Sequence, residues 1–177
     1  MKIAGWVGLA LVLGLAGCGQ DKDDVRLEQM SCPAVAVAPY ARDLVQWRGN
    51  GRDLTDLDYR LRVLDVRGSC TRKPQDDNLY VSATVSLDAT RGPAMTGDGV
   101  DATYFVALLR KGEIIQKTTF DVSGKFQPND DHLTLVDKPV VSKLPLSETL
   151  AGSDYSLVVG LQLSQAQLDD NRTASRR

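Results

Sequence analysis

The segment between Leu79 and Leu87 restricts the possible folds of this chain more than any other. Apolar side chains occupy every second position in it, and polar side chains fill the positions between. A period of two places the two sets on opposite faces of a β-strand. One face of such a strand is buried, so the chain needs a second layer of structure to cover it.

Further extended segments flank this strand, with turn residues between them. A helix is expected only near the end, where Ser164 and Gln167 have capping-box spacing before Asp170. Segment 40–47 is ambiguous. The other expected strands cover 34–38, 57–67, 103–109, 113–122, 132–144 with a break at Pro139, and 155–163. About seven strands and one short C-terminal helix predict an all-β sandwich of immunoglobulin-like or fibronectin-like type.

Two of these segments predict details of the sheets. Within 57–67 the apolar alternation changes phase, and a strand cannot change its buried face by one residue without an extra residue in the ladder. We therefore expect a β-bulge near Val63-Leu64. Segment 103–109 is apolar on both faces, so we expect it to lie centrally in a sheet.

Turn and corner residues add further expectations. Asn50-Gly51 predicts a turn because both residue types accept positive φ, and Lys111-Gly112 predicts a hairpin. Tyr155 follows Leu144-Pro145-Leu146 in the way that a corner tyrosine precedes a late strand in immunoglobulin-like folds. In those folds the tyrosine hydroxyl bonds to upstream backbone. The alternative for Tyr155 is an ordinary core aromatic.

Residues 1–17 have the pattern of a secretory signal segment. Lys2 precedes a run of apolar and small residues that is too short for a stable membrane span. The run ends in Leu15-Ala16-Gly17-Cys18, which resembles the lipobox of bacterial lipoproteins. That resemblance implies that Cys18 is acylated, becomes the first mature residue and anchors the protein to a membrane. An ordinary secreted protein with an incidental cysteine is the alternative.

The chain without its signal segment has 177 − 17 = 160 residues, which suits a single domain. Residues 18–31 are expected to be the lipidated cysteine and a tether, 32–172 the sandwich domain and 173–177 a disordered tail. Removal of Lys2 leaves 20 basic and 23 acidic side chains, a net charge of 20 − 23 = −3. Without a concentrated basic face, nucleic acid is not an expected partner.

Cys32 and Cys70 remain once Cys18 is acylated. An even pair of cysteines in an oxidising envelope predicts a disulfide. The alternative is a metal pair, although only His132 is available as a histidine ligand. No metal and no cofactor are therefore expected.

The mature chain also resembles an uncharacterised family of alphaproteobacterial lipoproteins, from near Met30 almost to the end. The family has no established activity, so the resemblance implies an envelope location and no catalytic residue. The matching stretches are Cys32-Pro33-Ala34-Val35, Gly51-Arg52-Asp53-Leu54-Thr55-Asp56, Gly68-Ser69-Cys70, Arg91-Gly92-Pro93-Ala94, Tyr104-Phe105-Val106-Ala107, Gly160-Leu161-Gln162-Leu163 and Asn171-Arg172.

The residues that could perform catalysis do not form a recognisable motif. His132 lies in a predicted turn, and no Gly-x-Ser-x-Gly elbow accompanies it. The aspartate clusters lack calcium-loop spacing, and Gly97-Asp98-Gly99 is a turn without the further glycine of a phosphate loop. Turns and solvated faces explain the clusters, which are Asp53, Asp56 and Asp58, then Asp76 and Asp77, then Asp98 and Asp101.

Two loops are candidates for binding a partner. Residues 91–101 form a long loop for a β-domain, and long ordered loops on sandwiches often carry recognition. Its candidate residues are Arg91, Gly92, Pro93 and Asp98. A connection without a function is the alternative. Arg52 and Asp53 are the second candidates, unless they simply pair with each other.

These observations predict a lipid-anchored, non-catalytic β-sandwich that binds a protein partner or organises the envelope. Gly19 follows the cysteine where lipoproteins retained at the inner membrane have aspartate, so the periplasmic face of the outer membrane is expected. One alternative is an accessory subunit of an envelope export or assembly complex, which a large exposed apolar patch would favour. Another is a hydrolase with paired carboxylates in one cleft.

Overall fold

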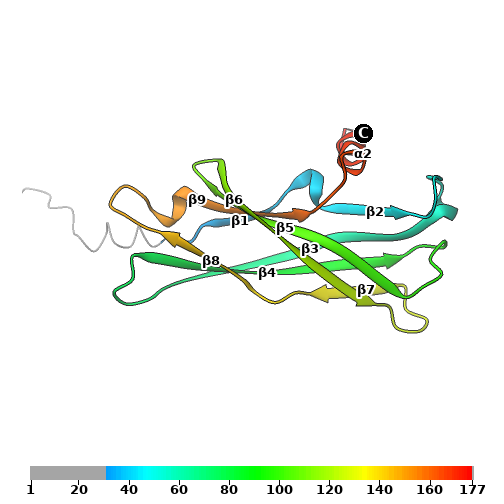
Figure 1. Cartoon of the computed structure of the whole chain (residues 1–177), viewed down its shortest axis with the longest axis horizontal. Helices are drawn as coiled ribbons and strands as arrows, with labels where there is room; N and C mark the ends of the chain where they lie inside the picture. The colour runs from blue at the N-terminus through cyan, green and yellow to red at the C-terminus, as the bar shows by residue number, and fades with distance from the viewer. Residues whose placement is uncertain (1–30, 177) are drawn as a thin grey trace, which may run out of the picture.

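A computed structural model describes residues 31–176 of the chain (Figure 1). The expected signal segment 1–17, the lipobox cysteine Cys18 and the tether as far as residue 30 lie outside the described residues. The elements are β1 (Ala34–Val37), η1 (Pro39–Ala41), β2 (Asp43–Trp47), η2 (Leu54–Asp56), β3 (Leu57–Arg72), β4 (Asn78–Arg91), β5 (Gly99–Arg110), β6 (Glu113–Lys125), β7 (His132–Val136), β8 (Val140–Pro145), η3 (Gly152–Asp154), β9 (Tyr155–Leu161) and α2 (Gln165–Ala174).

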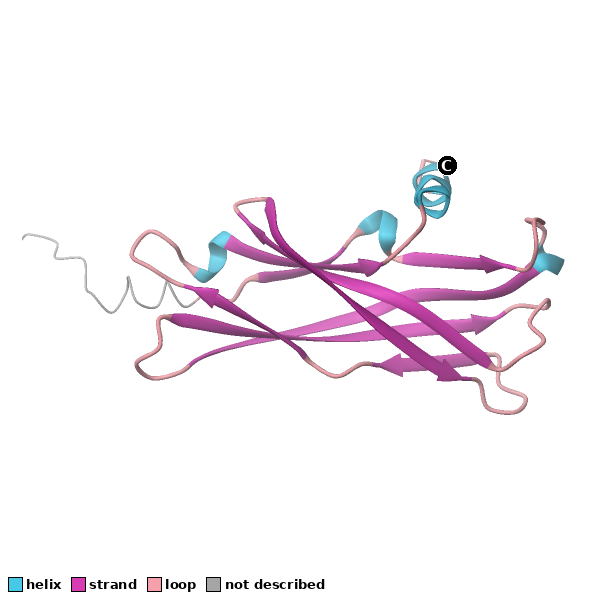
Figure 2. Cartoon of the chain, viewed as in Figure 1, coloured by secondary structure: helices cyan, strands magenta, loops and turns pink. Residues whose placement is uncertain are grey.

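The strands form two stacked sheets, and Figure 2 shows how little helix accompanies them. One sheet has the order β1-β9-β5-β6. The other has the order β2-β3-β4, and both β7 and β8 pair with the far side of β4, on either side of Pro139. The predicted all-β sandwich with a short C-terminal helix is confirmed.

The strands of this chain can be matched to strand positions in an immunoglobulin-like sandwich. In that fold strands A, B and E share one sheet, while C′, C, F and G share the other. Here β3, β4 and the β7–β8 pair take the places of A, B and E, and β6, β5 and β9 take those of C′, C and F. The place of G beside β9 is taken by β1, which runs parallel to β9.

The N-terminal segment therefore belongs to both sheets. After β1 the chain makes the turn η1 and enters β2, which pairs antiparallel with β3 in the opposite sheet. This crossing explains why segment 40–47 lacks a clear period, since a turn and a short edge strand share it.

The core follows the alternation in the sequence. Leu79, Val81, Ala83, Val85 and Leu87 are each at most 2% exposed. The same holds for the inward side chains of β9, which are Tyr155, Leu157, Val159 and Leu161. Strand β5 lies between β9 and β6, as its two apolar faces predict.

The predicted bulge is present in β3. Its pairing with β4 shifts between Val63 and Asp65, so Leu64 is the extra residue and is 51% exposed. Val63 is buried before the bulge, and Val66 packs against the core after it. The phase change seen in the sequence is thus the bulge itself.

The turns agree with the sequence in position but not always in the residue that carries positive φ. Lys111 and Gly112 have φ of 51° and 87° and connect β5 to β6 as a hairpin. In the first turn the positive φ of 67° falls on Gly49, and not on Asn50 or Gly51 as expected. A Cβ at Gly51 would lie 1.9 Å from a carboxylate oxygen of Asp56, so a larger residue there would require that side chain to move.

Three tyrosine hydroxyls connect the two sheets. Tyr155 donates to the Pro145 carbonyl at 2.8 Å, which confirms the predicted tyrosine corner. Tyr59 donates to the Asp101 carbonyl at 2.8 Å, and Tyr104 donates to an Asp137 carboxylate oxygen at 2.6 Å. Burial raises the pKa of all three hydroxyls, so they remain protonated donors at neutral pH.

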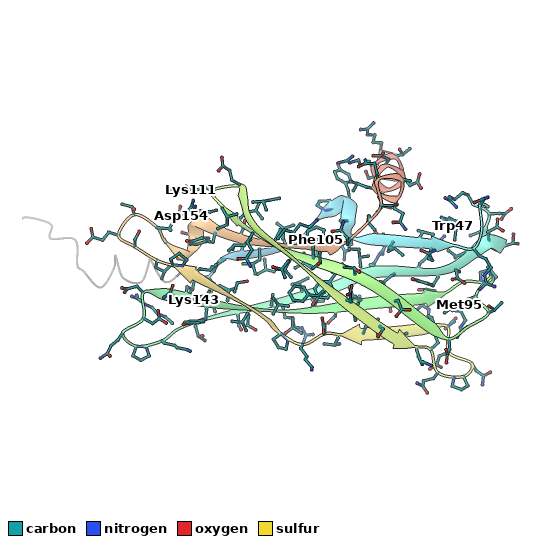
Figure 3. The ribbon with its side chains drawn as sticks, viewed as in Figure 1. Trp47, Met95, Phe105, Lys111, Lys143 and Asp154 are labelled. Carbon is teal, nitrogen blue, oxygen red and sulfur yellow. A yellow bond between two sulfur atoms is a disulfide. The ribbon has the colours of Figure 1, made fainter. Side chains whose placement is uncertain are left out.

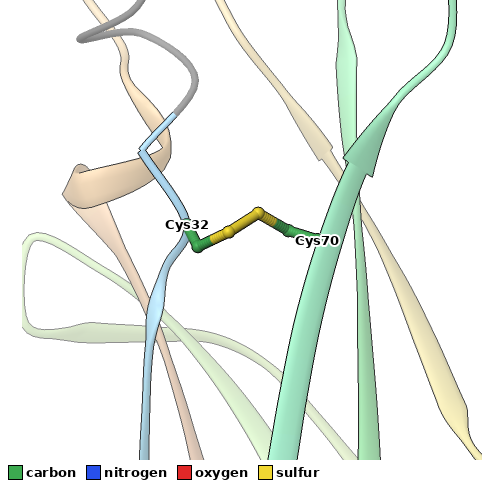
Figure 4. The surroundings of a disulfide bond; sticks show 2 residues. All are labelled: Cys32 and Cys70. Carbon is green, nitrogen blue, oxygen red and sulfur yellow. A yellow bond between two sulfur atoms is a disulfide. The ribbon is translucent and has the colours of Figure 1, made fainter.

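The predicted disulfide joins Cys32, just before β1, to Cys70 on β3 (Figure 4). The two Cα atoms are 5.8 Å apart, within the range that a disulfide spans. The bond ties the first described strand of one sheet to the long strand of the other. This pairing replaces the alternative of a metal pair.

Helix α2 begins at the predicted capping box, in which the Ser164 hydroxyl accepts from the Gln167 backbone and the Gln167 side chain accepts from Ser164. The tail was expected to start at 173, but the helix continues to Ala174. The Thr173 hydroxyl donates to the Asp169 carbonyl, and the Asn171 side chain holds the helix to the domain. One local contact within the helix and one tertiary contact thus stabilise the last turn, beyond the boundary expected from the sequence.

Candidate recognition surface

The two candidate loops meet at one end of the sandwich, remote from Ser31. Trp47 and Met95 mark this end in Figure 3, and Asp154 and Lys143 lie toward the opposite end. The Arg48 guanidinium joins the loops, because it donates to the Asp58 carboxylate at 3.2 Å and to the Thr96 hydroxyl at 3.0 Å. Residues 48–56 and 92–98 therefore form one surface, which we call the far end.

Backbone hydrogen bonds hold the second loop against β3. The Gly92 N–H donates to the Asp58 carbonyl at 2.7 Å, and the Ala94 N–H donates to the Leu57 carbonyl at 2.8 Å. Gly92 is buried, and a Cβ at this position would lie 2.1 Å from the Leu57 oxygen. The loop is therefore anchored at its start, and glycine is required there for close approach of two backbones.

Arg91 is directed into its own loop. Its guanidinium donates to the Gly97 carbonyl at 2.8 Å and lies 4.7 Å from the centre of the Phe126 ring. Asp98 forms an ion pair of 3.8 Å with Lys125, and Pro93 is exposed. These contacts are structural, and a role of Arg91, Pro93 or Asp98 in binding a partner stays a prediction.

Arg52 and Asp53 do not pair with each other. The Arg52 guanidinium donates to the Gly51 carbonyl at 2.9 Å and lies 5.9 Å from the centre of the Trp47 ring. Asp53 closes η2, where its backbone N–H donates to the Asp56 carboxylate. Arg52 is exposed, so it is the candidate cation that faces solvent.

A hollow opens beside Trp47 and Arg52, between β2 and helix α2. Its volume is about 350 Å³, and Val45, Trp47 and Arg52 line the strand side of it. Asn171 keeps the helix in place, because its side-chain amide donates to the backbone carbonyls of Tyr40 at 2.9 Å and Asp43 at 2.7 Å. We call this space the α2 hollow.

A second hollow of about 570 Å³ continues along β2, β3 and β4 and shares Val45 and Asn171 with the first. Arg62 is among its lining residues and forms an ion pair with Asp43, while the Asp88 carboxylate also interacts electrostatically with this guanidinium. The hydrogen bond that Arg62 donates to the Asp43 carboxylate raises the pKa of Arg62. Asp43 and Asp88 are therefore counter-ions of one arginine. This arrangement does not provide the paired acid and base that hydrolysis by two carboxylates needs.

Other residues considered for chemistry lie apart from these hollows. His132 is exposed, and its nearest ionic neighbour is Asp131 at 3.9 Å. Within residues 31–176, no three side chains of metal-binding type gather at one point. In the same part of the chain, no helix has the length and apolar character needed to cross a membrane.

The sequence analysis missed most residues that line the hollows. Trp47 lies in the ambiguous segment 40–47, and Asn171 was named only in a stretch that resembles the lipoprotein family. Arg60 and Arg62 alternate with buried residues on β3, which marks an outer sheet face but not a hollow. Only the packing of α2 over β2 turns that face into a concave surface.

Comparisons with protein-family models, with curated proteins and with solved structures find no match to this chain.

Proposed function

We propose that this chain is a lipid-anchored binding module of the bacterial cell envelope that holds a protein partner and performs no chemistry. Residues 1–17 and the sequence Leu15-Ala16-Gly17-Cys18 support the anchor, and Gly19 supports the outer membrane. The observation that carries the binding role is the exposed Arg52 beside Trp47 at the mouth of the α2 hollow.

The chemistry of this pair suits protein recognition. Tryptophan and arginine are enriched among the residues that dominate binding energy at protein interfaces. A guanidinium beside an aromatic ring combines a planar hydrogen-bond donor with a flat apolar surface. The guanidinium can donate to an acidic or amide side chain of a partner, and the ring can pack against an apolar side chain. The far end favours a partner that carries such a pair.

The position of the surface is consistent with an anchor at Cys18. A segment of 13 residues between Cys18 and Cys32 spans at most about 45 Å. The domain would then stay near the membrane with its Ser31 end towards the lipid. The far end would point away from the membrane, where a partner in the periplasm reaches it.

The anchor is tested by Cys18→Ser in cells. We expect the wild-type chain to incorporate a lipid label and to sediment with membranes, and the variant to do neither. Unchanged membrane recovery of Cys18→Ser, with no lipid label in the wild type, contradicts the anchor.

The binding role is tested by photo-crosslinking in cells. A photoreactive residue in place of Arg52 should give a defined crosslinked species, which a probe in place of the exposed Glu148, near the opposite end, should not give. Arg52→Glu, combined with a probe at the neighbouring exposed Leu54, should reduce that species. Crosslinks of equal yield at positions 52 and 148 contradict a specific surface at the far end.

A further inference from the structure

Strand β6 ends its sheet, and its outer edge has no partner strand among the described residues (Figure 1). It is 13 residues long and mostly exposed. Long open edges are sites where another strand can add, because their backbone groups are unpaired. We propose that this edge pairs antiparallel with β6 of a second copy of this chain.

Two hydrogen bonds show which residues of β6 have free backbone groups. The Thr103 carbonyl accepts from Gln162, so Thr103 directs its backbone towards the β9 side of β5. The Phe126 N–H donates to the Asp98 carbonyl across the β5–β6 ladder. In an antiparallel ladder such residues alternate. The even-numbered residues of β6 from Gln116 onwards therefore bond to β5, and the odd-numbered ones point their backbone groups to the open edge.

The odd-numbered side chains also share one face of the sheet. Asp121 accepts from the Thr103 hydroxyl at 2.6 Å, and Lys117 donates to Gln162 at 2.9 Å, both on the outer face. Phe120 points to the other face, where it stacks on the buried Tyr104 with ring centres 5.3 Å apart. Lys117, Thr119 and Asp121 are all exposed.

This arrangement is self-complementary in charge about Thr119. In a symmetric antiparallel pair centred on Thr119, each residue faces the residue equally far on the other side of the centre in the second copy. Lys117 then faces Asp121 of the second copy, and Asp121 faces Lys117. Among the centres from 117 to 121, only Thr119 gives this pairing, whereas centring on Asp121 brings Lys117 against Lys125.

The inner face of β6 supports the same partner. A hollow of about 770 Å³ lies between β6 and the β7–β8 connection, lined by Val106, Leu108 and Phe120 on one side and Val140 on the other. In the pair centred on Thr119, Phe120 faces Thr118 of the second copy. The partner strand therefore extends the sheet past the mouth of this hollow, which both apolar and polar side chains line, and joins two four-stranded sheets into one of eight strands.

The register is tested by single cysteines in the full-length chain, purified in detergent. Thr119→Cys places two thiols at a directly opposed pair with Cα atoms about 5.5 Å apart, which a disulfide spans. Ser123→Cys lies on the same face, but position 123 faces position 115 of the second copy. The two introduced cysteines are then eight residues apart along the strand, about 27 Å. We expect mild oxidation to crosslink Thr119→Cys at least about tenfold faster than Ser123→Cys. Equal rates overturn the proposal.

The charge pairing between Lys117 and Asp121 of the second copy is tested by reversing the two charges. We expect the wild-type chain to sediment as a concentration-dependent dimer, and Lys117→Glu and Asp121→Lys each to weaken it about tenfold or more, because like charges then face each other. The double variant Lys117→Glu/Asp121→Lys restores both pairs and should restore the dimer. Melting temperatures within a few degrees of wild type show that each variant is folded. A monomeric wild type, or a double variant no better than the singles, overturns the proposal.

Discussion

The two ends of the sandwich are closed by different means. At the end near Ser31, the Cys32–Cys70 disulfide joins the sheets covalently, and a Cβ at Gly152 would lie 1.9 Å from the Ser31 carbonyl. At the far end, the Arg48 guanidinium and a few backbone hydrogen bonds hold the loops. Side-chain contacts at the surface open at lower free energy than covalently closed structure. The far end should therefore adapt to a partner while the end near Ser31 stays rigid.

A tyrosine bridge is common to both ends. Tyr155 connects the sheets near Ser31 and Tyr59 connects them at the far end, each through a 2.8 Å hydrogen bond to a backbone carbonyl. The difference between the ends is therefore not in this bond. It lies in the disulfide on one side and in the arginine-linked loops on the other.

The largest expected effect on stability comes from removing the Cys32–Cys70 disulfide at the end near Ser31. Replacing Cys32 and Cys70 by serine should lower the free energy of unfolding by about 4 kcal/mol, because the chain entropy of a 38-residue separation is released in the unfolded state. Urea unfolding of wild type and variant measures the difference, and a reductant should reproduce it in the wild type alone. Two titratable thiols in unreduced wild-type protein would contradict the bond.

Gly92 tests how tightly the far-end loop is anchored. Gly92→Ala should lower the free energy of unfolding by about 1–3 kcal/mol, because the new Cβ collides with the Leu57 carbonyl. Gly97→Ala in the same loop is the matched control, since a Cβ there has no atom within 4 Å. Equal melting temperatures for the two variants would mean that the loop can move away from β3 without a loss of stability.

The two tyrosines test the feature that the ends share. Tyr155→Phe and Tyr59→Phe should each lower the free energy of unfolding by about 1 kcal/mol, through the loss of one hydrogen bond. Burial raises both pKa values, so the proton is held more tightly in the folded state. This stabilisation is present below pH of about 10, the ordinary tyrosine pKa, and is lost as the pH rises further. Urea unfolding at pH 8 and pH 11 should show less pH dependence in each variant than in wild type; an unchanged dependence contradicts the bridges.

The smallest effect is expected at the arginine that links the loops. Arg48→Ala removes an ion pair whose side chains are 44% and 24% exposed, so the loss of stability should stay below about 1 kcal/mol. Amide exchange in residues 92–98 should nevertheless become faster, because Arg48 also binds Thr96. Arg67→Ala is the control, since Arg67 forms its ion pair with Asp65, two residues away. Equal rates of amide exchange in both variants would mean that backbone hydrogen bonds alone keep the loop ordered.

Local patterns were enough to predict the strands, the bulge and the helix cap. The alternation from Leu79 to Leu87 and the phase change at Val63-Leu64 are properties of neighbouring residues, and the structure reproduces both. The disulfide followed from a count, because only two cysteines remain if Cys18 is acylated. The corner tyrosine followed from its place before a late strand.

The candidate site was predicted less well, because side-chain direction depends on contacts that are distant in the sequence. A role of Arg91 in binding a partner stays a prediction, and its contacts with the Gly97 carbonyl and the Phe126 ring could not be predicted from the sequence. The sequence did identify Arg52 as a candidate. It contained no sign that Trp47 lies beside it.

By itself, the sequence determined that this chain forms an all-β sandwich with a C-terminal helix, since strand period and capping act over a few residues. Only the tertiary structure decided that β1 takes the place beside β9. The same holds for Asn171, which holds α2 to Asp43, 128 residues earlier, and so creates the α2 hollow. Such pairings depend on which buried faces and backbone groups are left to satisfy once the whole chain is assembled, and no local pattern encodes that choice.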